Sequence, residues 1–303
     1  MNSILKQPKV SRKQSAKLAA GSAFTLIELL VVICVVTLLA ATLVPTLAGS
    51  RIGSQSLRCM NNNRQLCAAW RMYADDSNER LVYASTADSS SPFSTDPSDP
   101  DNYAWTGAHM DFNGANRANW DPAYDMMKRP LWSYSPNAGL YKCPSDHSAV
   151  VYLGINRPRT LSFSMNLYVG GFAPARGGGP DGDDGGWPFA DPYRIFSKTT
   201  DLTAPGPAKT FIFVDMRPEA INWGDFLTDM TGYPDNPAQY RFGDFPGVFH
   251  NLGASISFGD GHVEIHRWLD PLTAPPPPFN FASLSSPNNV DIGWLQAHST
   301  SPK

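Results

Sequence analysis

The feature that most constrains this chain of 303 residues is an apolar run at residues 24–48, which contains one carboxylate, Glu28, and one proline, Pro45. About 20 apolar residues suffice to cross the hydrocarbon core of a membrane as a helix. Each Leu, Ile, Val or Phe favours insertion by about 0.3–0.6 kcal/mol, and one charge opposes it by about 2.5–3.5 kcal/mol. The sequence therefore predicts a transmembrane helix over residues 24–48.

The orientation of this helix follows from the residues before it. Residues 1–23 carry five Lys and Arg side chains and no acidic one. Because basic flanks stay in the cytoplasm, the rest of the chain is expected to be exported. A cut after Ala48, as in an ordinary secretory signal, is the competing outcome and predicts a fully secreted protein.

Glu28 is the unusual residue of the apolar run. A carboxylate inside a membrane span is costly and marks a functional site by default, unless it lies high enough to reach the head groups. Residues 23–28, AFTLIE, resemble the processing site of type IV prepilins and type II secretion pseudopilins.

This resemblance implies roles for four residues. Prepilin peptidase would cut between Ala23 and Phe24 and methylate the new amino terminus. Glu28 would then pair with the amino group of a neighbouring subunit, and Pro45 would kink the helix. The family usually has glycine at the position of Ala23. The implied location is the inner membrane, with a single span, a cytoplasmic N-terminus and a periplasmic head.

Charge and composition limit the possible partners. The whole chain has a net charge of −3. Removal of the five basic residues in residues 1–23 leaves −8, which argues against nucleic acid as a partner. The 24 Gly and 27 Pro residues predict long loops.

Four cysteines are present, of which Cys34 lies in the apolar run. Cys59 and Cys67 are about 12 Å apart on one predicted helix, too far to bond to each other. Our hypothesis is a disulfide between Cys59 and Cys143, since an exported head faces an oxidising compartment. The alternative is free buried thiols.

The remaining chain predicts an α+β fold: a pilin-like protein whose long N-terminal transmembrane helix packs on a head with an antiparallel β-sheet and long loops. The expected parts are a leader at 1–23, the membrane helix at 24–48, its continuation at 49–75, a head at 76–270 and a Pro- and Ser-rich extended or disordered tail at 271–303. Residues 210–215 read as a buried strand. Residues 254–258 and 263–268 read as a hairpin around an Asp-Gly turn.

The predicted hairpin carries a second resemblance. His250, Asp260 and Gly261 reproduce the His-x9-Asp-Gly signature of a large group of pilin-like proteins with the same prepilin leader. Residues 60–66, 141–146 and 213–215 also resemble that group. The resemblance implies an architecture and a location rather than an activity.

Three interpretations of the signature remain open: His250 hydrogen-bonds the turn at Asp260, ligates a metal, or forms a catalytic pair. His262, Glu264 and His266 are candidate metal ligands because alternate strand residues share a face, although positions two apart lie about 7 Å from each other. The Asp-rich stretch at 181–184 is a weak candidate for Ca²⁺. No cofactor is otherwise expected.

Together these features predict a structural subunit, not an enzyme, that is assembled into a type II secretion pseudopilus or a type IV pilus-like filament. Its expected partners are prepilin peptidase, other pilin or pseudopilin subunits and inner-membrane lipid. Two alternatives come from other classes of protein. One is an envelope-tethered, metal-dependent enzyme that uses His250, Asp260 and His262; the other is a glycan-binding display protein.

Overall fold

The computed structural model describes residues 24–86, 93–107, 109–174, 192–275 and 284–303, with only the backbone described for 40–52. The chain divides into two units, residues 1–50 and residues 51–303. The predicted leader, including Ala23, lies outside the described residues, as does the Asp-rich stretch at 181–184. For Pro45 the structure describes only a place in the helix backbone.

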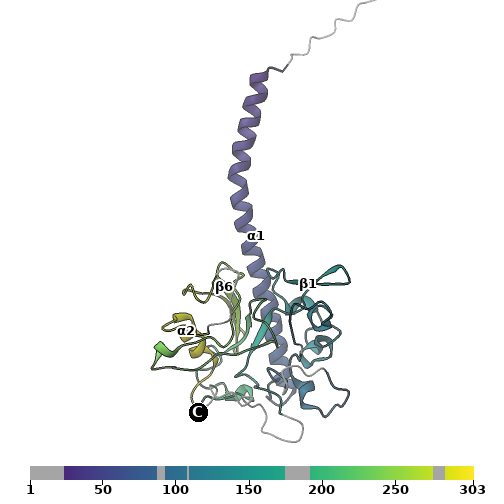
Figure 1. The fold of residues 1–303 in the computed structure, drawn as a ribbon, viewed down its shortest axis with the longest axis vertical. Coiled ribbons are helices and arrows are strands. Elements are labelled where there is room, and N and C mark those ends of the chain that lie inside the picture. The colour runs from purple at the N-terminus through teal and green to yellow at the C-terminus, as the bar shows by residue number, and fades with distance from the viewer. Residues whose placement is uncertain (1–23, 87–92, 108, 175–191, 276–283) are drawn as a thin grey trace, which may run out of the picture. The chain divides into compact units, whose positions relative to one another are not determined.

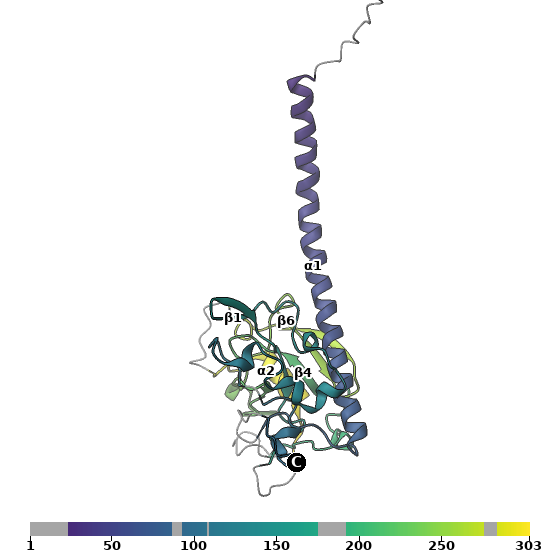
Figure 2. The same cartoon turned by 90° about the vertical axis from the view of Figure 1, so that its right-hand side faces the viewer.

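Figures 1 and 2 draw the chain as a ribbon that is coloured from the N-terminus to the C-terminus. The α-helices are α1 (Leu26–Asp76) and α2 (Val290–Ser299). The strands are β1 (Ala149–Tyr152), β2 (Ile155–Pro158), β3 (Phe163–Asn166), β4 (Phe211–Asp215), β5 (Asp225–Phe226), β6 (Gly253–Phe258) and β7 (Val263–Arg267). Short 3₁₀ turns are η1 (Pro100–Tyr103), η2 (Arg117–Asn119), η3 (Met126–Lys128), η4 (Pro130–Ser133), η5 (Ala138–Tyr141), η6 (Thr199–Asp201) and η7 (Pro237–Gln239).

Helix α1 is 51 residues long and covers the range expected for a continuous helix. It ends where Asn78 and Glu79 adopt positive φ angles of 56° and 68°, and the amide of Glu79 donates to the carbonyl of Ala74. Left-handed residues of this kind satisfy the last carbonyls of a helix and stop it.

The predicted transmembrane helix and the predicted inner-membrane location are wrong. Among the described residues, no helix combines the length and the apolar character that a membrane crossing requires. Residues 24–39 are apolar except for Glu28 and two threonines, but the helix continues through a polar half that contains Arg58, the Asn61–Asn63 run and Arg64. Helical continuity over 51 residues is therefore not evidence for a span.

The three asparagines of α1 are weak helix formers, and the structure gives two of them another role. Asn62 Nδ2 donates to the carbonyl oxygens of Gly139 and Lys142, at 2.9 and 3.2 Å. Asn63, fully buried, donates to the carbonyl oxygen of Ser255 in β6 at 3.1 Å. The side chains thus attach α1 to the segment around η5 and to the sheet.

The main sheet has five strands in the order β5-β3-β4-β6-β7. All neighbours are antiparallel except β3 and β5, which are parallel. The expected antiparallel sheet is therefore corrected to a mixed one. The difference arises because β5 follows β4 through a long loop, which lets it add beside β3 in parallel.

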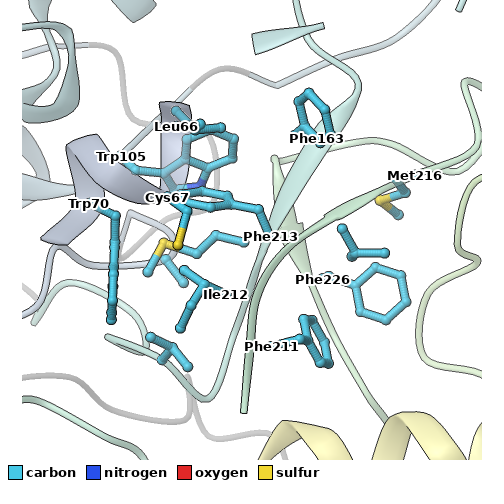
Figure 3. Packing of buried hydrophobic residues seen from close by; sticks show 14 of the residues in the cluster. Leu66, Cys67, Trp70, Trp105, Phe163, Phe211, Ile212, Phe213, Met216 and Phe226 are labelled. Carbon is cyan, nitrogen blue, oxygen red and sulfur yellow. The ribbon is translucent and has the colours of Figure 1, made fainter. Parts of the chain in front are cut away.

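The core lies between α1 and the central strand β4, all of whose residues are buried. Leu66, Cys67 and Trp70 of α1 are fully buried and belong to one cluster with Ile212 and Phe213 of β4 (Figure 3). These helical positions are spaced by one, three and four residues, so they share a face. The apolar face of residues 53–76 therefore covers the sheet.

The C-terminal segment differs from the extended or disordered tail expected at 271–303. Within its described part, Asn289 caps α2 by accepting hydrogen bonds from the amides of Asp291 and Ile292. Ile292 and Leu295 are buried. The proline-rich composition of the segment hid this short helix, whose two core residues are only three positions apart.

Candidate functional site

The proposed processing site has one described member, Phe24, whose side chain is 72% exposed. Glu28 is not left without a partner, contrary to expectation. Its Oε2 accepts hydrogen bonds from the amide and the hydroxyl of Thr25, at 2.9 and 2.8 Å, and its own amide donates to Thr25 Oγ1 at 3.3 Å. This is a capping box, the reciprocal arrangement that satisfies amides at the start of a helix. The hydrogen bond from the Thr25 backbone lowers the pKa of Glu28.

The His-x9-Asp-Gly signature does not form one site. His250 Nε2 lies 3.1 Å from Asp215 Oδ2, whereas Asp260 Oδ1 accepts a hydrogen bond from the amide of His262 and contacts the His262 ring. The interpretation that His250 fixes the turn at Asp260 is therefore wrong, and so is the grouping of His250, Asp260 and His262 as an enzyme site. Asp260 and Gly261, which has φ of +92°, form the hairpin turn without a contact to His250 among the hydrogen bonds of the described residues.

The three candidate ligands in and just before β7, which are His262, Glu264 and His266, do not converge either. The His262 ring stacks on Phe258, with centroids 4.2 Å apart. His266 stacks on Trp294 of α2 at 3.8 Å, and burial lowers the pKa of His266. Glu264 Oε1 lies 3.7 Å from His266 Nδ1. The His262 ring therefore packs against β6 and the His266 ring against α2, and the two imidazoles do not face a common point.

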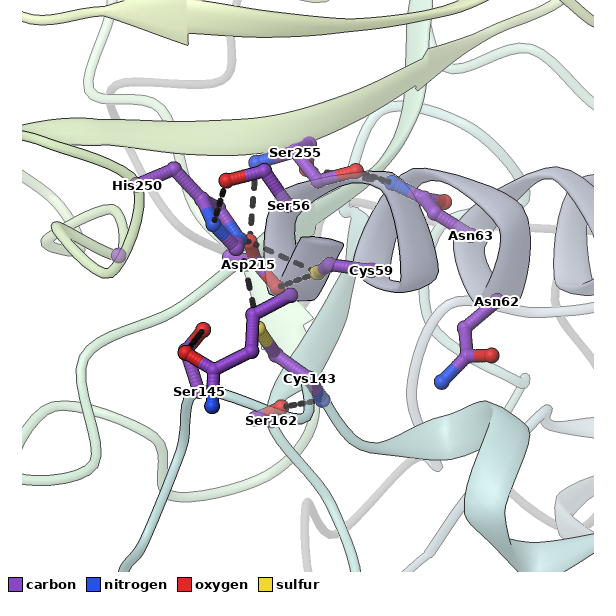
Figure 4. Close-up of polar contacts among 12 residues, drawn as sticks. Ser56, Cys59, Asn62, Asn63, Cys143, Ser145, Ser162, Asp215, His250 and Ser255 are labelled. Carbon is purple, nitrogen blue, oxygen red and sulfur yellow. Dashed lines mark hydrogen bonds and ion pairs between the residues drawn. The ribbon is translucent and has the colours of Figure 1, made fainter. Parts of the chain in front are cut away.

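A different cluster gathers four side chains with metal-binding chemistry. Cys59 of α1, Cys143 after η5, Asp215 at the end of β4 and His250 before β6 place one ligand atom each within 4.8 Å of the others (Figure 4). All four are buried: His250 is 4% exposed and the other three are fully enclosed. We call these four residues the Cys-Cys-Asp-His cluster.

Short contacts hold the cluster together. Cys59 Sγ donates to the two carboxylate oxygens of Asp215, at 3.5 and 3.4 Å. Cys143 Sγ lies 3.3 Å from His250 Nε2. The same nitrogen faces Asp215 Oδ2, as given above. Four segments far apart in the sequence thus direct polar atoms toward one enclosed point.

Backbone and side-chain groups around the cluster fix its members. The amide of Ser255 donates to Asp215 Oδ2 at 2.9 Å, and Ser56 Oγ lies 3.0 Å from His250 Nδ1. The amide of Cys143 donates to Ser162 Oγ at 2.6 Å. Gly247 approaches Asp215 so closely that an added Cβ would lie 2.7 Å from Asp215 Cβ. Asp215, His250 and Cys143 are therefore held in place from outside the cluster.

The predicted Cys59–Cys143 disulfide is not formed. Both residues are free thiols, although their sulfur atoms lie within 4.8 Å of each other. A disulfide requires a sulfur–sulfur distance of about 2.05 Å. Here the sulfurs are directed instead at polar partners, Asp215 for Cys59 and His250 for Cys143.

Burial and hydrogen bonding shift the titration of the cluster. Burial raises the pKa of Cys59, and contacts with Cys143 and Asp215 raise it further. Burial also acts to raise the pKa of Cys143, but hydrogen bonds from Cys59 and His250 outweigh it and lower that pKa. Burial acts to lower the pKa of His250, and the contacts with Asp215 and Cys143 reverse this and raise it to about 9. Contacts within the cluster thus lower the pKa of Cys143 and raise the pKa of His250.

This arrangement is not a nucleophilic triad. In a triad, one imidazole nitrogen faces the nucleophile and the other faces the orienting carboxylate. Here Cys143 and Asp215 both face Nε2 of His250, and Nδ1 faces Ser56. The sulfur of Cys143 is also enclosed, since the residue is 0% exposed. The geometry fits coordination of an ion better than attack on a substrate.

A separate cavity of about 200 Å³ opens beside β5 and is lined by Trp223, Asp225, Asp229, Arg241 and Asp244, among others. Burial raises the pKa of Asp225 to about 6 and raises the pKa of Asp244 as well. Arg241 Nε lies 3.0 Å from Asp229 Oδ2. No member of the Cys-Cys-Asp-His cluster lines this cavity.

The sequence pointed to three members of the cluster but did not bring them together. The sequence predicts a Cys59–Cys143 disulfide and places His250 beside Asp260, whereas the structure places His250 beside Asp215. Asp215 was missed as a site residue, although it ends a strand whose other residues are all apolar. A carboxylate at the end of a buried strand was the signal that could have identified it.

Comparisons with known proteins complete the description of the site. No protein-family model, no curated protein and no solved structure matches this chain.

Proposed function

We propose that this protein is a subunit of a filament of the type II secretion pseudopilus or type IV pilus kind. Prepilin peptidase would process it between Ala23 and Phe24 and methylate the new terminus. Its assembly partners would be copies of itself or similar subunits. The resemblance of residues 23–28 to prepilin processing sites is the sequence basis of the proposal.

The observation that carries the proposal is the exposed apolar surface of residues 24–39. Consecutive side chains from Leu29 to Ile33 are 49–56% exposed, and Leu26 and Ile27 are 81% and 71% exposed. A helix that is apolar around its whole circumference needs partners on all sides, not on one face. Parallel packing among copies of the same helix supplies such partners.

Glu28 supplies the charge complementarity for this packing. Cleavage before Phe24 would create a positively charged amine four positions from Glu28. Between two copies, the amine of one subunit could meet the carboxylate of the next. Ion pairs formed away from water are strong enough to set register between subunits. The capping contact with Thr25 would be exchanged for, or shared with, this pair.

The test compares three variants in cells that produce the protein, with filament incorporation and the mass of the mature terminus as readouts. Glu28→Ala removes both charge and cap. Glu28→Gln removes the charge but keeps the hydrogen bond of a capping box, which Gln also makes. Asp75→Asn, on the exposed face of the same helix, is the matched control.

We expect a methylated Phe24 terminus in every case, loss of incorporation with both Glu28 variants and normal incorporation with Asp75→Asn. Rescue by Glu28→Gln would show that the carboxylate acts only as a helix cap. A mature protein that still begins at Met1, or that begins after Ala48, would overturn the proposal.

A further inference from the structure

We propose that the Cys-Cys-Asp-His cluster is a structural zinc site, with Cys59 Sγ, Cys143 Sγ, Asp215 Oδ2 and His250 Nε2 as its four ligands. This site lies within residues 51–303 and does not depend on the proposed filament function. It would join four segments of the chain: α1, the segment after η5, the end of β4 and the loop before β6.

The spacing of the ligand atoms matches a tetrahedral ion. Zinc bonds of about 2.3 Å to sulfur and about 2.0 Å to nitrogen or oxygen place neighbouring ligand atoms about 3.3–3.8 Å apart. The observed separations are 3.4 Å from Cys59 Sγ to Asp215 Oδ2, 3.3 Å from Cys143 Sγ to His250 Nε2 and 3.1 Å from that nitrogen to Asp215 Oδ2. The other three separations between ligand atoms are each within 4.8 Å, so an inward movement of the side chains would complete the tetrahedron.

Hydrogen bonds alone do not account for this convergence. His250 Nε2 carries at most one hydrogen, yet it faces both the Cys143 sulfur and an Asp215 oxygen. One N–H cannot point well at both. A cation at the centre satisfies the nitrogen lone pair, both sulfurs and the carboxylate at once. The chemistry of the set, two thiols with an imidazole and a carboxylate, is that of zinc proteins.

The surroundings also fit a metal site. A metal-bound histidine uses its second ring nitrogen to donate a hydrogen bond that fixes the ring, and Ser56 Oγ lies 3.0 Å from His250 Nδ1 as the acceptor. The amide of Ser255 orients the Asp215 carboxylate. Since four protein ligands fill the tetrahedron and all are buried, the site is closed to substrate and its role is structural.

Zinc binding releases protons from the ligands. The thiols of Cys59 and Cys143 each lose one proton to solvent and bind Zn²⁺ as thiolates. Asp215 binds as a carboxylate, and His250 releases the proton on Nε2 to solvent and binds as the neutral imidazole through the Nε2 lone pair. The metal and its three anionic ligands carry a net charge of −1, which the amide of Ser255 faces. Zinc affinity therefore falls at low pH, where protons compete for the ligands.

The test uses the full-length protein, purified without chelator. Elemental analysis is expected to find about one zinc per chain. After removal of zinc, titration with Co²⁺ should give thiolate-to-metal charge-transfer absorption and the intense visible bands of a tetrahedral site. X-ray absorption at the zinc edge should show two sulfur and two nitrogen or oxygen neighbours at the distances given above.

Variants locate the site. Cys143→Ser and His250→Gln should each lower zinc content at least tenfold and lower the Tm. Cys67→Ser is the matched control, because Cys67 is also a buried free cysteine of α1 but donates to the carbonyl oxygen of Phe258 instead. It should keep its zinc. If the cluster variants do not fold, the X-ray absorption spectrum of the wild-type protein tests the site instead, through the two sulfur neighbours that it should show.

Any of the following results would overturn the proposal. The first is a wild-type protein that neither contains zinc nor gives the Co²⁺ charge-transfer band. The second is a Cys59–Cys143 disulfide in the isolated protein, found by mass spectrometry without reduction. The third is an X-ray absorption spectrum without sulfur neighbours, or zinc retained in folded Cys143→Ser and His250→Gln variants.

Discussion

At the scale of single residues, the buried carboxyl group of Asp225 predicts that the stability of the fold depends on pH. Asp225 is buried beside the cavity, near Asp229, Arg241 and Asp244, and burial raises its pKa to about 6 despite a hydrogen bond from Ser85. A raised folded-state pKa contributes stability that is complete below the unfolded pKa, near 4, and is lost as pH rises through about 6. The folded protein should therefore lose up to about 3 kcal/mol from this group between pH 4 and pH 7.

Asp225→Asn tests this contribution, because the amide cannot ionise. Denaturant unfolding at several pH values should show the variant gaining stability relative to wild type by up to about 3 kcal/mol as pH rises from 4 to 7.5. Asp235→Asn, at an exposed position, is the matched control for replacing an Asp by an Asn. A stability difference between Asp225→Asn and wild type that does not change with pH would contradict the assignment.

At the scale of elements, the buried face of α1 gives the second prediction. Leu66 is fully buried against the sheet, whereas Leu57 on the same helix is 68% exposed. Leu66→Ala removes buried apolar contacts and leaves a cavity, so it should lower the free energy of unfolding by about 2–5 kcal/mol. Leu57→Ala should change it by about 0.5 kcal/mol or less. Equal losses would show that residues 53–76 do not pack as described.

Two glycines test the backbone of α1 and of the β6–β7 hairpin. Gly261 adopts φ of +92° in the turn, where a Cβ is strained, so Gly261→Ala should destabilise the fold by about 1–3 kcal/mol. Gly53 lies in α1 with no atom near the site of a Cβ, so Gly53→Ala should stabilise it by about 1 kcal/mol. Thermal unfolding measures both effects: we expect Gly261→Ala to lower the Tm and Gly53→Ala to raise it.

At the scale of the whole molecule, the two units of the chain predict separable behaviour. A chain that begins at Arg51 keeps the core and the Cys-Cys-Asp-His cluster and lacks the exposed apolar side chains of residues 24–39. It should unfold at nearly the Tm of the full-length protein and remain monomeric in sedimentation. The full-length chain should self-associate at the same concentration. A monomeric full-length chain would contradict the role assigned to the apolar helix.

Local sequence signals determined much of the framework. The apolar spacing at Leu66 and Trp70 predicted the helix beyond residue 50, and the Asp-Gly turn predicted the β6–β7 hairpin, because both patterns depend on neighbours within a few residues. A local pattern gave a wrong prediction where the role of the segment depended on more than its own residues. The apolar run at 24–48 predicted a membrane span that the described helix does not support.

Only the tertiary structure decided the site. His250 and Asp260 are ten positions apart and carry a signature, yet His250 meets Asp215, which is 35 residues away. Cys59 reaches the same carboxylate from 156 residues away. Contacts between residues so far apart in the sequence are set by the packing of α1 on β4 and by the register of β6 beside β4. No local propensity encodes them, since each segment alone is compatible with many partners.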